Sequence, residues 1–190
     1  MAEARQPGER VDYVVTYLEM TERPLAPPPP RPANIQTALL RAEDPPADYF
    51  LFLYRFVGAE YEWTDWLERP RADVEAFVGS GDVLLYTLMV EGWPGGFFML
   101  DTSENAVCDL AYFGLTPPAI GRGLGRWFLA TAVDTGWSLP GIQKMTLNTN
   151  TLDHPRALGL YQKAGFQPVR REQHSRTILG SDVSWESNSG

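Results

Sequence analysis

The chain of 190 residues is 44% hydrophobic, which is enough for one compact domain with a substantial core and argues against two domains. Its 24 acidic and 16 basic residues give a net charge of −8, which argues against nucleic acid as a partner because the phosphate backbone attracts basic surfaces. Because Cys108 is the only cysteine and no apolar run approaches the length of a membrane span, the sequence predicts a cytoplasmic protein without an intramolecular disulfide or a membrane partner.

The N-terminal part is predicted to form two strands joined by a proline-rich arch. Residues 12–20, DYVVTYLEM, are rich in β-branched and aromatic side chains, which is typical of a strand. Prolines are concentrated in residues 24–32 and hold the backbone extended, so this segment is expected to lead to a second, short strand near residues 35–41. The proline run could also bind a proline-recognition module, but a linker is the preferred interpretation.

Residues 44–58 are predicted to form a helix that begins after Pro45 and Pro46 and ends at Gly58. A loop and a second helix, which reaches about Val78, are expected to follow. The loop is rich in large aromatic side chains, namely Tyr61, Trp63 and Trp66. These rings can either line a binding site or belong to the core, and the sequence leaves both possibilities open.

Three antiparallel strands are predicted at residues 83–90, 96–101 and 106–113, joined by turns at residues 91–95 and 102–105. Each turn segment contains glycine, proline, serine or asparagine, which are the residues that tight turns favour. This part of the chain is therefore expected to form the antiparallel part of a sheet.

Asp109 is a carboxylate in the middle of the third, apolar strand. Strand alternation places it on one face with Phe113 and places Cys108, Leu110 and Tyr112 on the other face. Burying an unpaired carboxylate is costly, so Asp109 is expected to have a partner on a neighbouring strand or loop, a bound water, or a catalytic role.

A glycine-spaced turn follows this strand and predicts a binding site for phosphate or pyrophosphate. Residues 115–126, LTPPAIGRGLGR, run from a strand end into a helix and carry glycines at positions 121, 123 and 125. Glycines let a bulky anion approach the main chain, and the N–H groups of the first helical turn point at it. A dinucleotide fingerprint is excluded because the sixth position from Gly121 is Arg126, and a Walker A loop is excluded because the turn lacks lysine.

The helix after the glycine turn is predicted to end near Trp137 and to be followed by a strand at residues 142–148. An earlier strand ends near Leu115. Gly114 interrupts that earlier strand and is a natural place for a bulge or for divergence of the two strands.

Asp153 is predicted to cap the next helix, which carries Tyr161 and ends at Gly165. Residues 166–171 and 174–179 are predicted to form a closing hairpin. The tail that begins at residue 180 is expected to be mobile.

Two motifs together resemble the GNAT superfamily of acyl-CoA N-acyltransferases. The first is the family's Gln/Arg-x-x-Gly-x-Gly/Ala loop, in which Gly123 and Gly125 match and Ile120 stands in place of the usual Gln or Arg. The second is Asn-x-x-Ala-x-x-x-Tyr-x-x-x-Gly-Phe, to which residues 153–166, DHPRALGLYQKAGF, are similar. The match includes Ala157, Tyr161, Gly165 and Phe166, while His154 replaces the usual Asn. The resemblance covers residues 80–170 well and the first eighty residues only loosely.

This resemblance implies an α+β fold: a three-layer α/β/α sandwich around a mixed, mostly antiparallel sheet with a splayed central parallel pair. It implies a single domain over residues 1–180, with residues 181–190 as the tail. The implied activity is direct transfer of an acetyl group from acetyl-CoA to a primary amine of an unidentified acceptor, either a small molecule or a protein. Acetyl-CoA is then a co-substrate, no metal is expected, and a homodimer is possible.

The resemblance also assigns roles to residues. Tyr161 is the expected acid that protonates the departing thiolate, and Asp109 is the expected general base, acting directly or through a water. The residues expected to bind acetyl-CoA are Phe113, Leu115, Ile120, Gly121, Arg122, Gly123, Leu124, Gly125, Arg126, Asn148 and His154. The expected acceptor site is formed by Tyr61, Trp63 and Trp66.

Two alternatives remain open at this point. The substitutions at Ile120 and His154 are compatible with a non-catalytic acyl-CoA-binding sensor or regulatory module. The aromatic side chains are compatible with an interaction protein in which the glycine segment is an ordinary turn.

Overall fold

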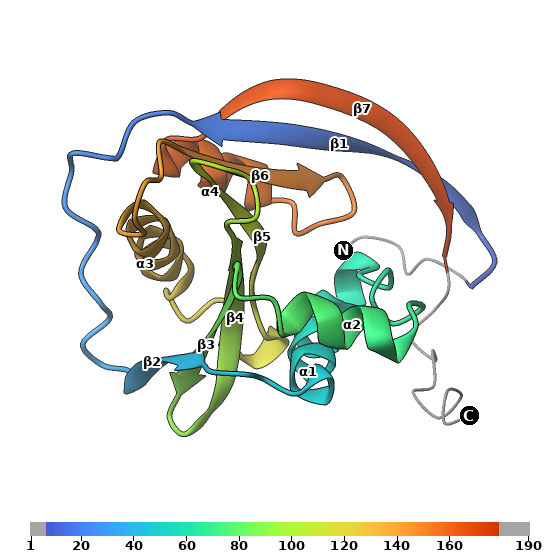
Figure 1. Cartoon of the computed structure of the whole chain (residues 1–190), viewed down its shortest axis with the longest axis horizontal. Coiled ribbons are helices and arrows are strands. Elements are labelled where there is room, and N and C mark those ends of the chain that lie inside the picture. Colours follow the sequence, from blue (N-terminus) through green and yellow to red (C-terminus); the bar gives the residue numbers. More distant parts are fainter. Residues whose placement is uncertain (1–6, 179–190) are drawn as a thin grey trace.

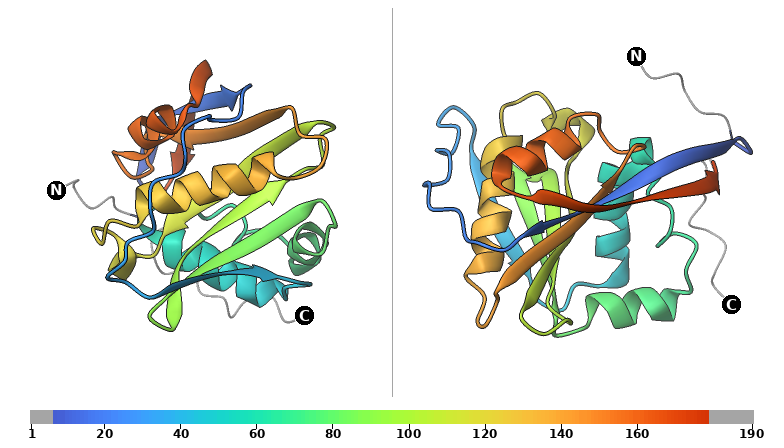
Figure 2. Two further views of the ribbon diagram at one scale, coloured as in Figure 1. Left: turned by 90° about the vertical axis from the view of Figure 1, so that its left-hand side faces the viewer. Right: turned by 90° about the horizontal axis from the view of Figure 1, so that it is seen from above.

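The computed structural model describes residues 7–178, which form one mixed sheet covered by helices on both faces (Figures 1 and 2). The sheet has seven strands in the order β2-β3-β4-β5-β6-β1-β7. Only β5 and β6 pair in parallel, and all the other neighbours are antiparallel. This arrangement confirms the three-layer α+β architecture expected from the sequence.

The element bounds follow the sequence predictions closely except near the C-terminus. The strands are β1 (Arg10–Met20), β2 (Thr37–Ala42), β3 (Val83–Val90), β4 (Trp93–Asp101), β5 (Val107–Leu115), β6 (Lys144–Asn150) and β7 (Gln167–Thr177). The helices are α1 (Ala47–Gly58), α2 (Arg71–Val78), α3 (Gly125–Trp137) and α4 (Ala157–Ala164), with short 3-10 turns η1 (Ala59–Tyr61) and η2 (Pro117–Ala119).

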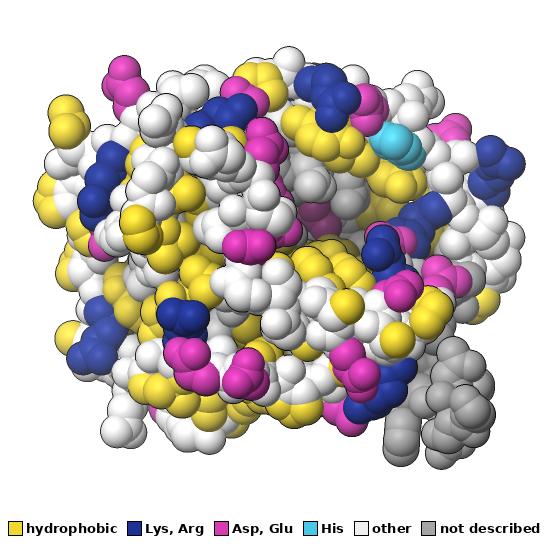
Figure 3. Space-filling model, viewed as in Figure 1, with side chains coloured by type: hydrophobic (Ala, Val, Ile, Leu, Met, Phe, Trp, Pro, Cys, Tyr) yellow, Lys and Arg dark blue, Asp and Glu magenta, His cyan; other side chains and the backbone are white. Residues whose placement is uncertain are grey.

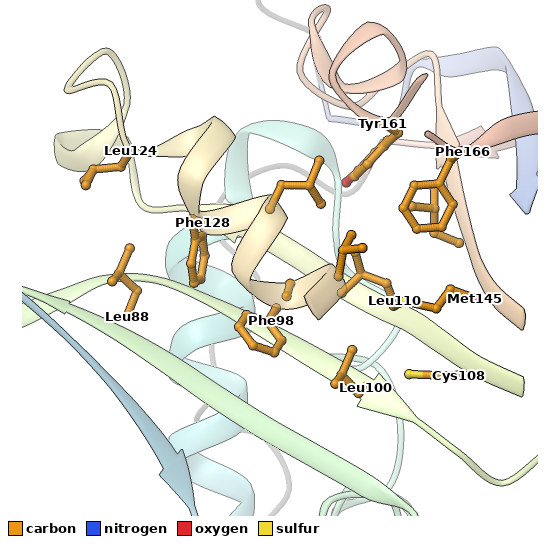
Figure 4. Close-up of a cluster of buried hydrophobic side chains, with 14 of the residues drawn as sticks. Leu88, Phe98, Leu100, Cys108, Leu110, Leu124, Phe128, Met145, Tyr161 and Phe166 are labelled. Atoms are coloured by element: carbon orange, nitrogen blue, oxygen red, sulfur yellow. The ribbon is translucent and has the colours of Figure 1, made fainter. Parts of the chain in front are cut away.

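Each face of the sheet buries its own hydrophobic core. On the side of α3 and α4, Phe98, Phe128 and Phe166 are fully buried, and Figure 4 shows them with Leu100 and Met145 between the sheet and these helices. On the side of α1 and α2, the core combines aliphatic side chains with the aromatic side chains of Phe50, Tyr54, Trp66 and Phe97, and Tyr112 packs against it. The periodic apolar positions of the helices therefore dock on opposite faces of one sheet.

The first strand lies far from the second. β1 inserts between β6 and β7, whereas β2 forms the opposite edge of the sheet beside β3. The segment between them, which contains the prolines, forms neither helix nor strand and passes α3 (Figures 1 and 2). Arg23 in this segment forms an ion pair with Asp134 of α3, which ties the crossing to the helix.

One predicted turn is shorter than expected, and one predicted hairpin is absent. The turn at residues 91–95 is in fact the two-residue turn Glu91-Gly92, because β4 already begins at Trp93. Both residues have positive φ angles, 50° and 93°, which is the backbone that a tight hairpin with right-handed strand twist requires. The predicted closing hairpin is also wrong, since residues 167–177 form one continuous strand that pairs with β1 along its length. The predicted mobile tail from residue 180 lies outside the described residues.

A β-bulge corrects the predicted faces of β5. Met99 pairs with Tyr112 and Leu100 pairs with Leu110, so Ala111 is the extra residue on β5. After the bulge the alternation is reversed. Phe113 therefore joins Cys108 and Leu110 in the core under α3, and Tyr112 lies on the other face, beside α1.

Candidate functional site

A cleft of about 480 Å³ opens where β5 and β6 diverge. The two strands pair only from Val107↔Lys144 to Asp109↔Thr146, so the predicted divergence is confirmed but begins several residues before Gly114. The lining comes from the end of α1 and its following turn, from residues 110–115 of β5, from the glycine loop, from Asn148 and from the segment at residues 153–161. Figure 3 shows a hollow on this face of the molecule, with strands β1 and β7 on one side and helices α1 and α2 on the other. Hydrophobic and acidic side chains lie inside it.

The glycine loop presents bare backbone to the cleft. Gly121 and Gly123 have φ angles of +81° and +79°, and a Cβ atom at either position would meet nothing within 4 Å. The first backbone hydrogen bond of α3 runs from the Phe128 N–H to the Leu124 carbonyl, at 2.9 Å. The N–H groups of residues 125–127 therefore have no partner inside the helix, and the positive end of the helix dipole faces the cleft.

The two arginines of the loop behave differently. Arg126 lines the cleft, and within the described part of the chain its guanidinium has no ion-pair partner. Arg122 is not part of the lining, because its Nη2 atom is held 2.9 Å from Oε2 of Glu91 in the turn between β3 and β4. One of the two predicted cationic ligands is thus available in the cleft, and the other is engaged in an ion pair.

Tyr161 reaches the cleft from α4. Its side chain is 8% exposed, and its hydroxyl makes no hydrogen bond to the described residues. Figure 4 shows the hydroxyl pointing away from Phe166, from α4 towards α3. Burial, followed by the charge of Asp153, raises the pKa of Tyr161 well above its ordinary value, so the phenol keeps its proton at neutral pH and can act as a donor.

Trp63 is fixed against β5 by two glycines. A Cβ atom on Gly58 would lie 2.3 Å from Cβ of Trp63, and one on Gly114 would lie 2.3 Å from Cγ1 of Val57 and 3.8 Å from the Trp63 ring. Only glycine permits this close approach of α1, Trp63 and β5. Gly114 therefore serves the packing of the cleft wall and not a bulge, which lies at Ala111.

Arg176 near the end of β7 holds the loop that carries Trp63. Its guanidinium donates to the Glu62 carbonyl at 2.9 Å and to Oγ1 of Thr64, and it lies 3.3 Å from Asp65. β7, which follows both motifs in the sequence, thus positions the loop that carries Trp63, which precedes them.

Asp153 joins the two sides of the cleft. Its Oδ2 atom accepts hydrogen bonds from Oγ1 of Thr149, at 2.7 Å, and from the Asn150 N–H, at 2.9 Å. Its Oδ1 atom accepts from Nε1 of Trp63 at 3.1 Å. Asp153 is therefore not the predicted helix cap, since α4 begins at Ala157 and no side chain caps it.

His154 is held by its own loop and by an aromatic neighbour. Its Nδ1 atom accepts a hydrogen bond from the Arg156 N–H at 3.1 Å, and its ring lies edge-on to Tyr61 at 6.3 Å between centroids. Both rings line the cleft.

Two further predicted site residues, besides Arg122, lie outside the cleft lining. Trp66 is buried in the aromatic core and donates to the Tyr112 hydroxyl at 2.6 Å. Asp109 accepts a hydrogen bond from Oγ1 of Thr146 on β6 at 2.6 Å, which corresponds to the predicted alternative of a partner on a neighbouring strand. Burial raises the pKa of Asp109, and the Thr146 hydrogen bond opposes part of that change.

The remaining predicted residues are brought together in the cleft lining: Tyr61, Trp63, Phe113, Leu115, Ile120, Gly121, Gly123, Leu124, Gly125, Arg126, Asn148, His154 and Tyr161. Sequence reasoning missed five functional candidates in the lining, namely Val57, Tyr112, Gly114, Asp153 and Arg156. The sequence predicted Asp153 to be a helix cap. Its position beside His154, at the start of the second motif, was the signal that it could have a different role.

Tyr112 is one of these additional residues. Burial raises the pKa of Tyr112 to about 12, and its hydroxyl accepts a hydrogen bond from Trp66.

Two searches of residues 7–178 gave negative results. No group of three or more His, Cys, Asp or Glu side chains in this part of the chain could hold a metal ion. None of its helices combines the length and the apolar character needed to cross a membrane.

Comparison with known proteins gives a family match over most of the chain. The model of the Acetyltransferase (GNAT) family matches residues 38–166. This range contains the glycine loop, Asp153 and Tyr161, but not β1 or β7. A search among curated proteins gives no match.

Solved structures share the fold at low sequence identity. A functionally unknown conserved protein from Staphylococcus epidermidis has a TM-score of 0.54 and 12% identity, and the match covers 90% of this chain and 63% of that one. A tandem GNAT protein from the clavulanic acid biosynthesis pathway has a TM-score of 0.57 and 15% identity, with 87% and 53% covered. Aminoglycoside N-acetyltransferase AAC(6')-Iy in complex with CoA has a TM-score of 0.52 and 17% identity, with 74% and 94% covered. The chain thus spans less than two thirds of the first two proteins and nearly all of the third.

Proposed function

Because the chain belongs to the GNAT acetyltransferase family, we propose that it transfers the acetyl group of acetyl-CoA directly to a primary amine of a small molecule or a protein. The family makes it an acyl-CoA-dependent acetyltransferase. The observation that carries the proposal is the cleft, which joins a bare glycine loop, two diverging strands and a buried phenol in one space.

The residues around the glycine loop suit a pyrophosphate. The unpaired N–H groups at the start of α3, the open space beside Gly121 and Gly123 and the unpaired charge of Arg126 all favour an anion at this place. Ile120 lacks the hydrogen-bonding side chain usual in this motif, so the backbone and Arg126 would carry more of the binding.

The strands suit the amide-containing part of the co-substrate. β5 and β6 stop pairing after Asp109 and Thr146, and the cleft is lined by residues 110–115 of β5 and by Asn148 of β6. Peptide groups that lack a partner at such a divergence can pair with an inserted chain as strands pair with each other. Acetyl-CoA supplies the activated acetyl thioester, and these residues would orient it.

Tyr161 is the proposed acid. Its hydroxyl is protonated at neutral pH, has no competing partner among the described residues and lines the same cleft as the loop. Donation from this hydroxyl would neutralise a departing thiolate. Asp109, the base expected from the sequence, would need water to reach the amine because it lies outside the cleft lining.

The acceptor is assigned only as an amine. The name of one structure that shares the fold, an aminoglycoside N-acetyltransferase, is consistent with transfer to nitrogen. A net charge of −8 also favours the approach of cationic amines over anionic ones.

Two measurements test the proposal. Calorimetry with CoA should show saturable binding, and release of free thiol from acetyl-CoA should depend on an added amine. Tyr161→Phe should lower the amine-dependent rate by about 10² to 10⁴, the range for a lost general acid, without weakening CoA binding. The matched control is Tyr86→Phe, on the opposite side of β4. A Tyr161→Phe protein as fast as the parent would remove Tyr161 from the mechanism, and a lack of CoA binding would refute the proposal.

A further inference from the structure

Asp153 is the only carboxylate among the described residues that line the cleft. The other ionisable side chains there are two arginines, a histidine and tyrosines. A negative charge fixed beside an aromatic wall favours cationic ligands over anionic ones.

The carboxylate of Asp153 accepts hydrogen bonds from neutral groups. Its three donors are a threonine hydroxyl, a backbone N–H and the indole N–H of Trp63. None of the ion pairs recorded for residues 7–178 includes Asp153. The carboxylate is therefore fixed in position while its charge is left uncompensated.

The field of Asp153 reaches both sides of the proposed reaction site. It contributes to the raised pKa of Tyr161, the proposed acid, and of Tyr61 on the aromatic wall. Because Oδ1 accepts only one hydrogen bond, from Trp63, it has a remaining lone pair for a ligand. Trp63 and Tyr61 supply aromatic faces beside it, which attract organic cations.

We infer that Asp153 binds an ammonium group of the acceptor other than the amine that is acetylated, so that the acceptors are diamines or larger polyamines. This inference rests on the proposed function. The held centre is not the nitrogen that reacts. A carboxylate in contact with the reacting nitrogen would stabilise its ammonium form, and only the neutral amine attacks a thioester. A second ammonium group keeps its charge throughout the reaction, so its contact with Asp153 positions the acceptor without opposing the chemistry.

Paired acceptors of equal length test the inference on the full chain. Thiol release from acetyl-CoA is measured with 1,4-diaminobutane and with 1-aminobutane, which differ only in the second amino group. The parent should show a KM at least about tenfold lower for the diamine, the size expected for one charge-assisted hydrogen bond. Asp153→Asn should abolish this preference, so that its KM values for the two amines agree within about twofold. Asp12→Asn, which removes one exposed acidic charge on β1, should keep the preference.

A second readout separates this inference from the proposed function and from misfolding. Calorimetry of 1,4-diaminobutane into the CoA-saturated protein should show binding to the parent and at least about tenfold weaker binding to Asp153→Asn, with CoA binding unchanged in both. Equal diamine binding to the two proteins, or equal KM values for the two amines in the parent, would overturn the inference and leave acetyl transfer intact. An Asp153→Asn protein that kept the tenfold KM preference for the diamine would also overturn it, because Asp153 would then not be the group that holds the second amine. If the protein released thiol without any added amine and still bound the diamine normally, the proposed function would be refuted and the inference about Asp153 would not.

Discussion

The two ends of the cleft are built in different ways. At the glycine-loop end, residues 120–126, the groups that face the cleft are contiguous in sequence and are mainly backbone. At the Trp63 end, Tyr61, Trp63 and Asp153 come from segments far apart in the chain, and hydrogen bonds and close packing bring them together. A backbone site tolerates side-chain changes as long as its conformation survives, whereas a side-chain site depends on the packing beneath it.

The largest expected effect tests the backbone end. Gly123→Val would place a β-branched residue at a φ angle of +79° and fill the space beside the loop. Left-handed backbone costs an L-residue about 1–2 kcal/mol, and the new side chain would also block the anion, so CoA should bind on the order of 100-fold more weakly. Calorimetry measures the change, and Gly81→Ala, at an open site without a positive φ angle, is the control. Unchanged CoA affinity would show that the loop is an ordinary turn.

The contrast between the two ends also explains what could be predicted from the sequence. The glycine loop, α3 and α4 were predicted because their signals are local: spaced glycines, helical periodicity and a C-terminal Gly165 with φ +113°. Trp63 and Tyr61 were predicted as site residues only through the family resemblance, and the sequence left open whether they were core. Trp66, in the same loop, is core, since it is buried in the cluster beneath α1 and is not part of the cleft lining.

The predictions that failed depend on contacts distant in sequence. The bulge at Ala111 reverses the faces of β5, and alternation alone cannot reveal it because the extra residue is defined by the partner strand β4. The predicted closing hairpin is a single strand because β1, from the other end of the chain, pairs along all of β7. Asp153 has a cap-like position in sequence, but its Oδ1 atom is bound by Trp63, ninety residues away.

An intermediate effect is expected at the packed end. Gly114→Ala would place a Cβ atom 2.3 Å from Cγ1 of Val57, so Val57 and the end of α1, which form part of the cleft wall, must shift. Overpacking of this kind costs about 1–3 kcal/mol of unfolding free energy. Because the wall moves while the loop does not, KM for the amine should rise by about tenfold and CoA affinity should change little. Thiol-release kinetics and calorimetry on the same protein separate the two effects, and a selective loss of CoA binding would contradict the division of the cleft.

A smaller effect is expected when the loop arginine is released. Glu91→Gln removes the charge that holds Arg122 at 2.9 Å, and Arg122 then becomes available to a phosphate beside the loop. Ion pairs at such partly exposed positions are worth about 0.2–1 kcal/mol, so CoA should bind about two- to fivefold more tightly. Glu43→Gln, which breaks the Arg41 ion pair on the far edge of the sheet, makes the same change in charge and should leave the affinity unaltered. An equal gain in both variants would mean that net charge, and not Arg122, is responsible.

The smallest effect on the cleft is expected at Asp109, which tests whether this residue belongs to the site or to the scaffold. Asp109→Asn keeps an oxygen that can accept from Thr146 and removes the buried charge. The folded-state pKa is raised, so the folded protein holds the proton more tightly than the unfolded chain does. The free energy of unfolding should therefore fall as the pH rises from about 4 through the raised pKa, and it should then level off. Relative to the parent, Asp109→Asn should be nearly equal in stability at pH 4 and more stable at pH 7. Denaturant titrations at the two pH values measure this difference, and thiol release should stay within about twofold of the parent. A rate loss of 10² or more, the order expected for a lost general base, would return Asp109 to the mechanism through a water relay.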